Sequence, residues 1–246
     1  MASNLPVPSN HTIKYFLFQV IASILFLMSS IRLTQHYFVI IMVLLMKLGA
    51  APFHLWLIRM ADKISFLNLI WVTVVQKIIP LRITIILSWN NSIIYLLILR
   101  YIIGILHIVM QVKIIKILVA SSVYSTPWVV VRFFCSDNLG WVFFLIYCIT
   151  QIVLIKLFHN YSFIPFKPKV LNMGAYSRIS LILILNLAGF PPRPLFFLKL
   201  KILELALNSF NVFIRFFLLL GARIVMYNYL NIIISSFLAG PRKSYY

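Results

Sequence analysis

Acidic residues are almost absent from this chain of 246 residues, which has three of them against 22 lysines and arginines. Only 10% of its residues are charged, whereas an ordinary globular domain has about a quarter. The two cysteines, Cys135 and Cys148, show no metal-ligand or disulfide spacing. The chain also lacks a glycine-rich phosphate loop, a haem-ligand pair and a Ser/His/Asp arrangement. We therefore expect no cofactor in this chain, and redox or nucleotide chemistry only in other chains.

Apolar residues, in contrast, make up 63% of the chain, and the mean hydropathy is +1.04. A soluble fold has no use for so much apolar surface, so a bilayer is the expected solvent. The apolar runs are continuous rather than alternating, which indicates helices rather than a barrel. The net charge of +19 is spread along the chain in single residues, which argues against nucleic-acid binding.

A span needs roughly 20 apolar residues, so the chain has room for about eight. We predict an all-α, polytopic transmembrane bundle that forms a single domain over residues 1–246. The expected spans are 13–31, 37–58, 64–88, 92–110, 113–134, 139–158, 177–206 and 211–237.

The loops support this count, because lysine and arginine gather on one side of the predicted bundle. That side receives Lys14, then Arg59 and Lys63, then Lys113 and Lys116, then Lys167, Lys169 and Arg178, and finally Arg242 and Lys243. By the positive-inside rule, both termini are expected on the cytoplasmic or mitochondrial matrix side.

Two spans contain residues that interrupt a helix. In the second span these are Gly49 and Pro52, and in the seventh they are Gly189, Pro191 and Pro192. Proline lacks the N–H of the helix ladder and its ring clashes with the preceding turn. Broken helices often form ion sites in transporters, although a break can also serve packing alone.

Three lysines, Lys47, Lys77 and Lys199, lie about ten residues from any span end, and we expect them to face the bundle interior. We expect Lys77 to lie on an uninterrupted helix. Lysine suits proton transfer because its reference pKa of about 10.4 falls when the side chain leaves water, whereas arginine stays protonated.

Several further basic residues have two readings. His54 lies on nearly the same helix face as Lys47 and could extend a proton path, or it could be a hydrogen-bonded residue near the headgroups. Lys116 could be a path entrance or a surface anchor. Headgroup positions are expected for Arg82, Arg100, Lys156 and Arg215, and a helix contact for Arg223.

The residues around the breaks resemble subunit two of NADH dehydrogenase, an antiporter-like membrane subunit of respiratory complex I. The most specific match is the segment from Met46 to Trp56, MKLGAAPFHLW. Further matches follow in the family's order: Ile13–Leu17 with Gln19, Ala22 and Ser23; Gln76-Lys77 with Pro80; Lys116–Leu118 with Ser121 and Ser122; Gly189–Pro192 with Lys199; and Arg223 with Tyr227.

The resemblance implies a proton-translocating subunit in which Lys47, Lys77 and Lys199 form a hydrophilic axis driven by quinone reduction elsewhere. NADH, flavin, iron–sulfur clusters and ubiquinone are then expected in other subunits. The expected partners are other membrane-arm subunits and lipids such as cardiolipin, in the mitochondrial inner membrane. The family's first helices, with a glutamate that pairs with the lysine matching Lys47, and its last helix have no match here. Either a separate chain supplies that carboxylate, which is the expectation we favour, or the pumping path is degenerate.

Two alternatives remain open at this point. The chain could be a purely structural membrane-arm subunit without proton flux, or a free-standing cation/proton antiporter.

Overall fold

The computed structural model describes residues 10–31, 37–50, 53–61, 65–87, 91–111, 113–160, 174–209 and 212–238. These residues form helices and no strand. In chain order the helices are α1 (Asn10–Ser30), α2 (Tyr37–Leu48), α3 (Leu55–Met60), α4 (Phe66–Thr73), the 3-10 turn η1 (Val75–Lys77), α5 (Ile78–Leu87), α6 (Asn91–Met110), α7 (Ile114–Cys135), α8 (Asp137–Asn160), α9 (Gly174–Ala188), α10 (Pro194–Ser209) and α11 (Val212–Leu238).

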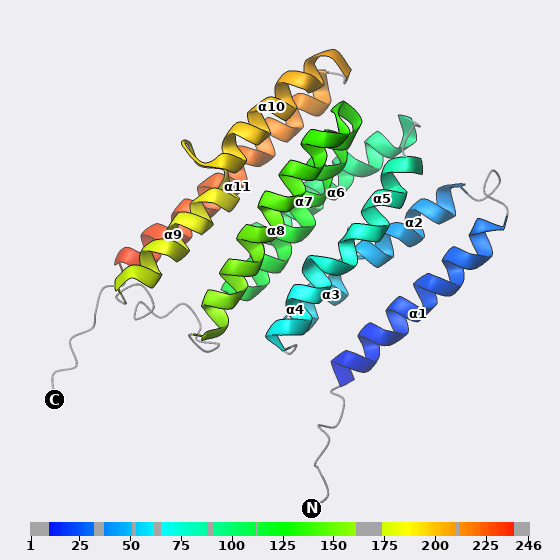
Figure 1. The fold of residues 1–246 in the computed structure, drawn as a ribbon, viewed down its shortest axis with the longest axis horizontal. Helices are drawn as coiled ribbons and strands as arrows, with labels where there is room; N and C mark the ends of the chain where they lie inside the picture. The colour runs from blue at the N-terminus through cyan, green and yellow to red at the C-terminus, as the bar shows by residue number, and fades with distance from the viewer. Residues whose placement is uncertain are drawn as a thin grey trace, which may run out of the picture.

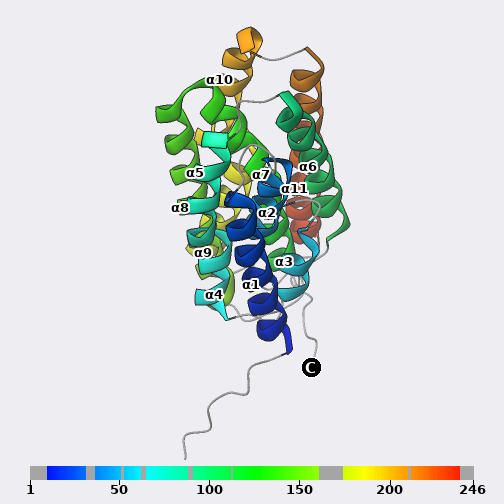
Figure 2. The same cartoon turned by 90° about the vertical axis from the view of Figure 1, so that its right-hand side faces the viewer.

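The helices lie side by side as a bundle, with α1 at one end and α9, α10 and α11 at the other (Figure 1). The 90° view in Figure 2 shows the same near-parallel arrangement. Among the described residues, five segments are long and apolar enough to cross a membrane, and three shorter apolar helices accompany them. Grouping α2 with α3, α4 with α5, and α9 with α10 gives eight crossings, as the sequence predicts.

Helix α7 is the centre of the bundle. Every side chain from Ile117 to Phe133 is buried, and α7 packs against α6, α8, α10 and α5. Large apolar side chains such as Trp128 and Val123 fill the core around it. The outer helices instead expose many leucine, isoleucine and phenylalanine side chains, as expected of a surface that meets lipid.

The third predicted span differs from expectation, because it is not one uninterrupted helix. Helix α4 ends at Thr73, and a 3-10 turn precedes α5. Pro80 explains the break: it has no N–H for the carbonyl of Gln76, and its ring crowds that carbonyl. Lys77 therefore lies in a broken segment, like the other two lysines.

Candidate functional site

The breaks after α2 and after α9 have the same backbone turn. At the first, the Gly49 N–H donates to the Met46 carbonyl at 3.1 Å and the Ala50 N–H to the Leu45 carbonyl at 3.0 Å. At the second, the N–H groups of Gly189 and Phe190 bond the carbonyls of Asn186 and Leu185 in the same register, each at 3.0 Å. This pair of bonds is the Schellman helix end, which needs a left-handed residue.

Glycine meets this need at both turns, since Gly49 has a φ of 58° and Gly189 a φ of 76°. An L side chain in this region costs roughly 1–2 kcal/mol. Pro191 and Pro192 follow Gly189 in the turn between α9 and α10. Pro52, the predicted breaking residue of the other turn, lies outside the described residues.

Lys199 reaches back from α10 to the second turn. Its Nζ lies 3.5 Å from the Ala188 carbonyl oxygen, 5.4 Å from the ring centre of Tyr124 and 5.7 Å from that of Trp128. The side chain is 7% exposed. The end of a helix carries partial negative charge, and aromatic faces attract cations, so this pocket stabilises an ammonium without a carboxylate.

Asn186 joins the two half-helices of the second break. Its side-chain oxygen accepts the Leu195 N–H at 3.2 Å, so a residue near the end of α9 caps the start of α10. The first N–H groups of a helix have no partner within the helix, and this bond satisfies one of them.

Lys77 is the most buried of the three lysines, at 2% exposure. Its Nζ donates to the Ser122 carbonyl of α7 at 2.6 Å. The contact joins a broken span to the central helix. The predicted interior positions of Lys77 and Lys199 are thus confirmed.

A polar cluster lies on α7 and α8 next to these lysines. The Gln151 amide donates to the Ser121 hydroxyl at 2.5 Å and to the Tyr147 hydroxyl at 2.6 Å. On the α6 side, the hydroxyls of Tyr101 and Tyr124 are 3.4 Å apart. These hydroxyl and amide groups are buried, and the Tyr124 ring also contacts Lys199.

Helix α7 has an irregularity of its own within this cluster. Pro127 cannot donate to the carbonyl of Val123, and the Thr126 hydroxyl donates to that carbonyl instead, at 2.7 Å. The helix thus continues across a proline at membrane depth with the freed carbonyl satisfied.

Lys47 differs from the expectation, because its side chain is partly exposed rather than interior. Its Nζ lies 5.3 Å from the ring centre of Phe26 on α1. The reason is its position at the end of the bundle, where α1 alone covers this side of α2 (Figure 1).

The other predicted residues fall in different places. His54 is buried with its ring centre 4.2 Å from that of His107 on α6, and Lys116 lies partly exposed in the first turn of α7. The headgroup position expected for Arg100 is wrong: it is 2% exposed, because it faces α7 rather than lipid. Arg223 is exposed rather than at a helix contact.

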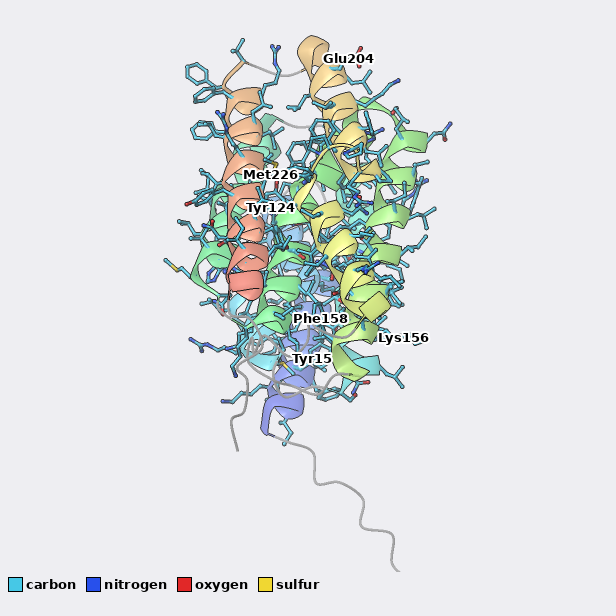
Figure 3. The ribbon with its side chains drawn as sticks, turned by 90° about the vertical axis from the view of Figure 1, so that its left-hand side faces the viewer. Tyr15, Tyr124, Lys156, Phe158, Glu204 and Met226 are labelled. Carbon is cyan, nitrogen blue, oxygen red and sulfur yellow. The ribbon has the colours of Figure 1, made fainter. Side chains whose placement is uncertain are left out.

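Carboxylates are scarce around these cations. Glu204 is the one acidic side chain that the structure describes, and it is exposed on α10 at an end of the bundle, far from mid-height Tyr124 (Figure 3). Asp62 and the side chain of Asp137 lie outside the described part. Within the described residues, no group of three His, Cys, Asp or Glu side chains could hold a metal.

Sequence reasoning missed the groups that contact the lysines, which are Tyr124, Trp128, Gln151 and the carbonyl oxygens. It also missed Arg132, which is fully buried and donates to the carbonyls of Leu139 and Leu198 at 2.9 and 2.5 Å. These side chains belong to α7 and α8, where polar residues interrupt otherwise apolar spans. That clustering was the sequence feature that could have identified them.

No family model matches the chain. Among known proteins, NADH-ubiquinone oxidoreductase chain 2 of Artemia franciscana is 31% identical over 229 residues, which cover 93% of this chain and 75% of that protein. The protein of the same name from Anopheles gambiae is 28% identical over 255 residues, which cover 96% of this chain and 74% of the relative.

Two solved structures share the fold. A chain of respiratory complex I from Thermus thermophilus with bound aureothin has a TM-score of 0.80 at 16% identity, covering 93% of this chain and 59% of that one. A chain of the Mrp complex from Dietzia sp. has a TM-score of 0.71 at 15% identity, covering 90% and 49%.

Proposed function

Because the chain belongs to the NADH-ubiquinone oxidoreductase chain 2 family, we propose that it is a proton-translocating subunit in the membrane arm of respiratory complex I. It is a multi-pass membrane subunit of an enzyme whose NADH, flavin, iron–sulfur and ubiquinone chemistry takes place in other subunits. Its own task is to relay protons through the bilayer.

The observation that carries this proposal is the burial of Lys77 and Lys199 against α7, where Lys77 contacts Ser122 and Lys199 lies near Tyr124 and Trp128. Each amine contacts a backbone carbonyl, Ser122 for Lys77 and Ala188 for Lys199. Neither contact needs a permanent charge on the lysine, because a neutral amine can still donate to a carbonyl. The two lysines can therefore gain and lose protons without losing their places.

The polar cluster on α7 and α8 can conduct a proton. Ser121, Tyr147 and Gln151 lie within hydrogen-bond range of one another. Hydroxyl groups both donate and accept, so a chain of them can pass a proton along. This arrangement supports a path from Lys77 to Lys199.

Lys47 would serve at the α1 end of the path, and His54 and Lys116 would be further members of it, with Lys116 near an entrance. Its amine is partly exposed between α1 and α2. Helix α1 is itself mostly uncovered, with 11% of Ile13–Ser30 buried. These facts support a neighbouring subunit that packs on α1 and supplies the carboxylate partner of Lys47.

The basic residues support an orientation as well. Lys14, Lys113 and Arg178 all begin helices that start at the same end of the bundle, where α11 ends (Figure 1). By the positive-inside rule, this end would face the mitochondrial matrix in the inner membrane. Lipids such as cardiolipin would bind there.

The test is proton transfer by the whole complex reconstituted in vesicles, with protons moved per NADH oxidised as the readout. Lys77→Ala and Lys199→Ala should lower this ratio while the complex still assembles. Lys156→Ala is the matched control, because Lys156 is an exposed lysine on α8 (Figure 3). Unchanged ratios in both buried-lysine variants would favour a structural subunit, and ion transport by the purified chain alone would favour an antiporter.

A further inference from the structure

Arg100 is a buried cation that the path described above does not use. It lies on α6 with 2% of its side chain exposed, and its Nη2 donates to the Thr126 hydroxyl of α7 at 3.3 Å. Its Nε is buried without a hydrogen-bond partner. A buried arginine with so few partners is costly compared with an apolar side chain of similar length, so packing alone is a poor reason for its presence.

Hydrogen bonding is also a poor reason for an arginine at position 100. The Thr126 hydroxyl already donates to the Val123 carbonyl that Pro127 leaves without a backbone partner. A methionine at position 100 would leave that bond in place. What the arginine adds at this position is a permanent positive charge, because guanidinium stays protonated.

That charge lies next to Lys77. Lys77 contacts Ser122 and Arg100 contacts Thr126, two residues four apart on one face of α7 and therefore about 6 Å apart along the helix. The two cations are close enough to interact electrostatically. Two like charges held against the same face of a helix and buried away from water repel each other.

Few other charged groups act on Lys77. Cys148 of α8 is its other titratable neighbour, and the Lys47 amine of α2 lies over Phe26. Arg82 of α5 is exposed. Asp137 begins α8 just beyond the end of α7 at Cys135, which is nine residues or about 14 Å along the axis from Thr126.

We propose that Arg100 is a positioning residue for proton transfer, whose fixed charge makes Lys77 release its proton readily. The inference rests on the proposed function, since it matters only if Lys77 carries protons. With Arg100 present, a proton that arrives on Lys77 is repelled and passes on. Without it, Lys77 holds its proton more tightly.

The experiment measures protons moved per NADH against pH in vesicles that contain the whole complex with Arg100→Met, Arg100→Gln or Arg100→Lys. Methionine removes charge and hydrogen bond, glutamine removes only the charge, and lysine keeps a cationic side chain but one that can lose its proton when buried. The neutral variants should pump less at neutral pH, and the alkaline limit of pumping should move up by about one pH unit, a tenfold change in proton affinity. Arg100→Lys should give a profile between the original and those of the neutral variants, and Arg82→Gln is the exposed control.

The double variant Arg100→Gln with Lys77→Ala separates the possibilities. The pH shift should vanish in it, because Arg100 acts through Lys77. If both neutral variants keep the pH profile of the unmodified complex while Lys77→Ala loses pumping, this inference alone is overturned. Normal pumping in Lys77→Ala alone would also overturn the inference, and normal pumping in both Lys77→Ala and Lys199→Ala would overturn the proposed function. Failure of both neutral variants to assemble, while the lysine variant assembles, would assign Arg100 a structural role and also overturn the inference.

Discussion

At residues 45–50 and at residues 185–190 the same two hydrogen bonds close the end of a helix, yet the neighbouring lysines lie in different surroundings. Lys47 precedes its turn and is partly exposed beside α1. Lys199 follows its turn, folds back over the last carbonyl of α9 and is buried against two aromatic rings. The comparison teaches that the same turn can lie beside an enclosed or a partly exposed amine. What packs against the lysine decides which: two aromatic rings of α7 at Lys199, and α1 alone at Lys47.

The largest expected difference comes from alanine at the two glycines. Both changes place an L residue at positive φ, which costs about 1–2 kcal/mol in either turn. At Gly189 the new Cβ would also lie 3.0 Å from the Lys199 Nζ, whereas at Gly49 it would meet Leu57 and Trp56 at 2.9 and 3.1 Å. Gly189→Ala should therefore reduce protons per NADH severalfold, and Gly49→Ala should mainly lower the melting temperature of the complex.

Gly189→Asn tells the two effects of the Gly189 change apart. Asparagine tolerates left-handed φ better than alanine but still carries a Cβ. A loss of pumping in both variants would point to displacement of the Lys199 amine. Recovery in Gly189→Asn would mean that backbone strain was the cause, and the contrast between the turns would then fail.

A smaller difference should separate Asn186 from Met46, which occupies the same position in the first turn. Asn186→Leu removes the cap on the Leu195 N–H and should cost about 1 kcal/mol, whereas Met46→Leu should cost little. Hydrogen exchange of the Leu195 amide should become about fivefold faster in Asn186→Leu. Asn186→Asp keeps the acceptor and is the control. Equal exchange rates in all three variants would show that the cap is unimportant.

The smallest effect concerns the aromatic rings. A double-mutant cycle of Trp128→Leu and Lys199→Met, read from the stability of the complex, should give a coupling of about 1 kcal/mol. The matching cycle of Phe26→Leu and Lys47→Met should give about 0.5 kcal/mol, because water screens a partly exposed amine. A larger coupling at Lys47 would contradict the idea that enclosure distinguishes the two sites.

The sequence was sufficient for the number of spans and for two of the three interrupted segments, because long apolar runs and Gly/Pro pairs are local signals. Pro80 was also a local signal for the third break, at Val75–Lys77, although its effect falls on the preceding turn rather than on itself. The interior position of Lys77 and Lys199 followed from the high cost of charge in lipid.

The directions in which side chains point could not be predicted in the same way. Helix α6 is apolar on all sides, so nothing in its pattern shows that Arg100 faces α7 rather than lipid. Lys47 shows the opposite error, since it was expected inside and lies at the end of the bundle. The groups that hold the buried lysines are the backbone carbonyls of Ala188 and Ser122. Every residue has such a carbonyl, so the sequence does not show which ones contact a lysine.

The turn between α9 and α10 has a consequence for conformational entropy. Pro191, Pro192 and Pro194 each have a φ fixed by the pyrrolidine ring, and the Arg193 N–H closes the turn on the Phe190 carbonyl at 3.0 Å. The unfolded chain therefore has fewer conformations to lose in this segment than an ordinary linker would have. The loss of backbone entropy in this turn therefore opposes the approach of Lys199 to the end of α9 only weakly. The prolines thus favour the enclosure of the Lys199 amine before any contact with it forms.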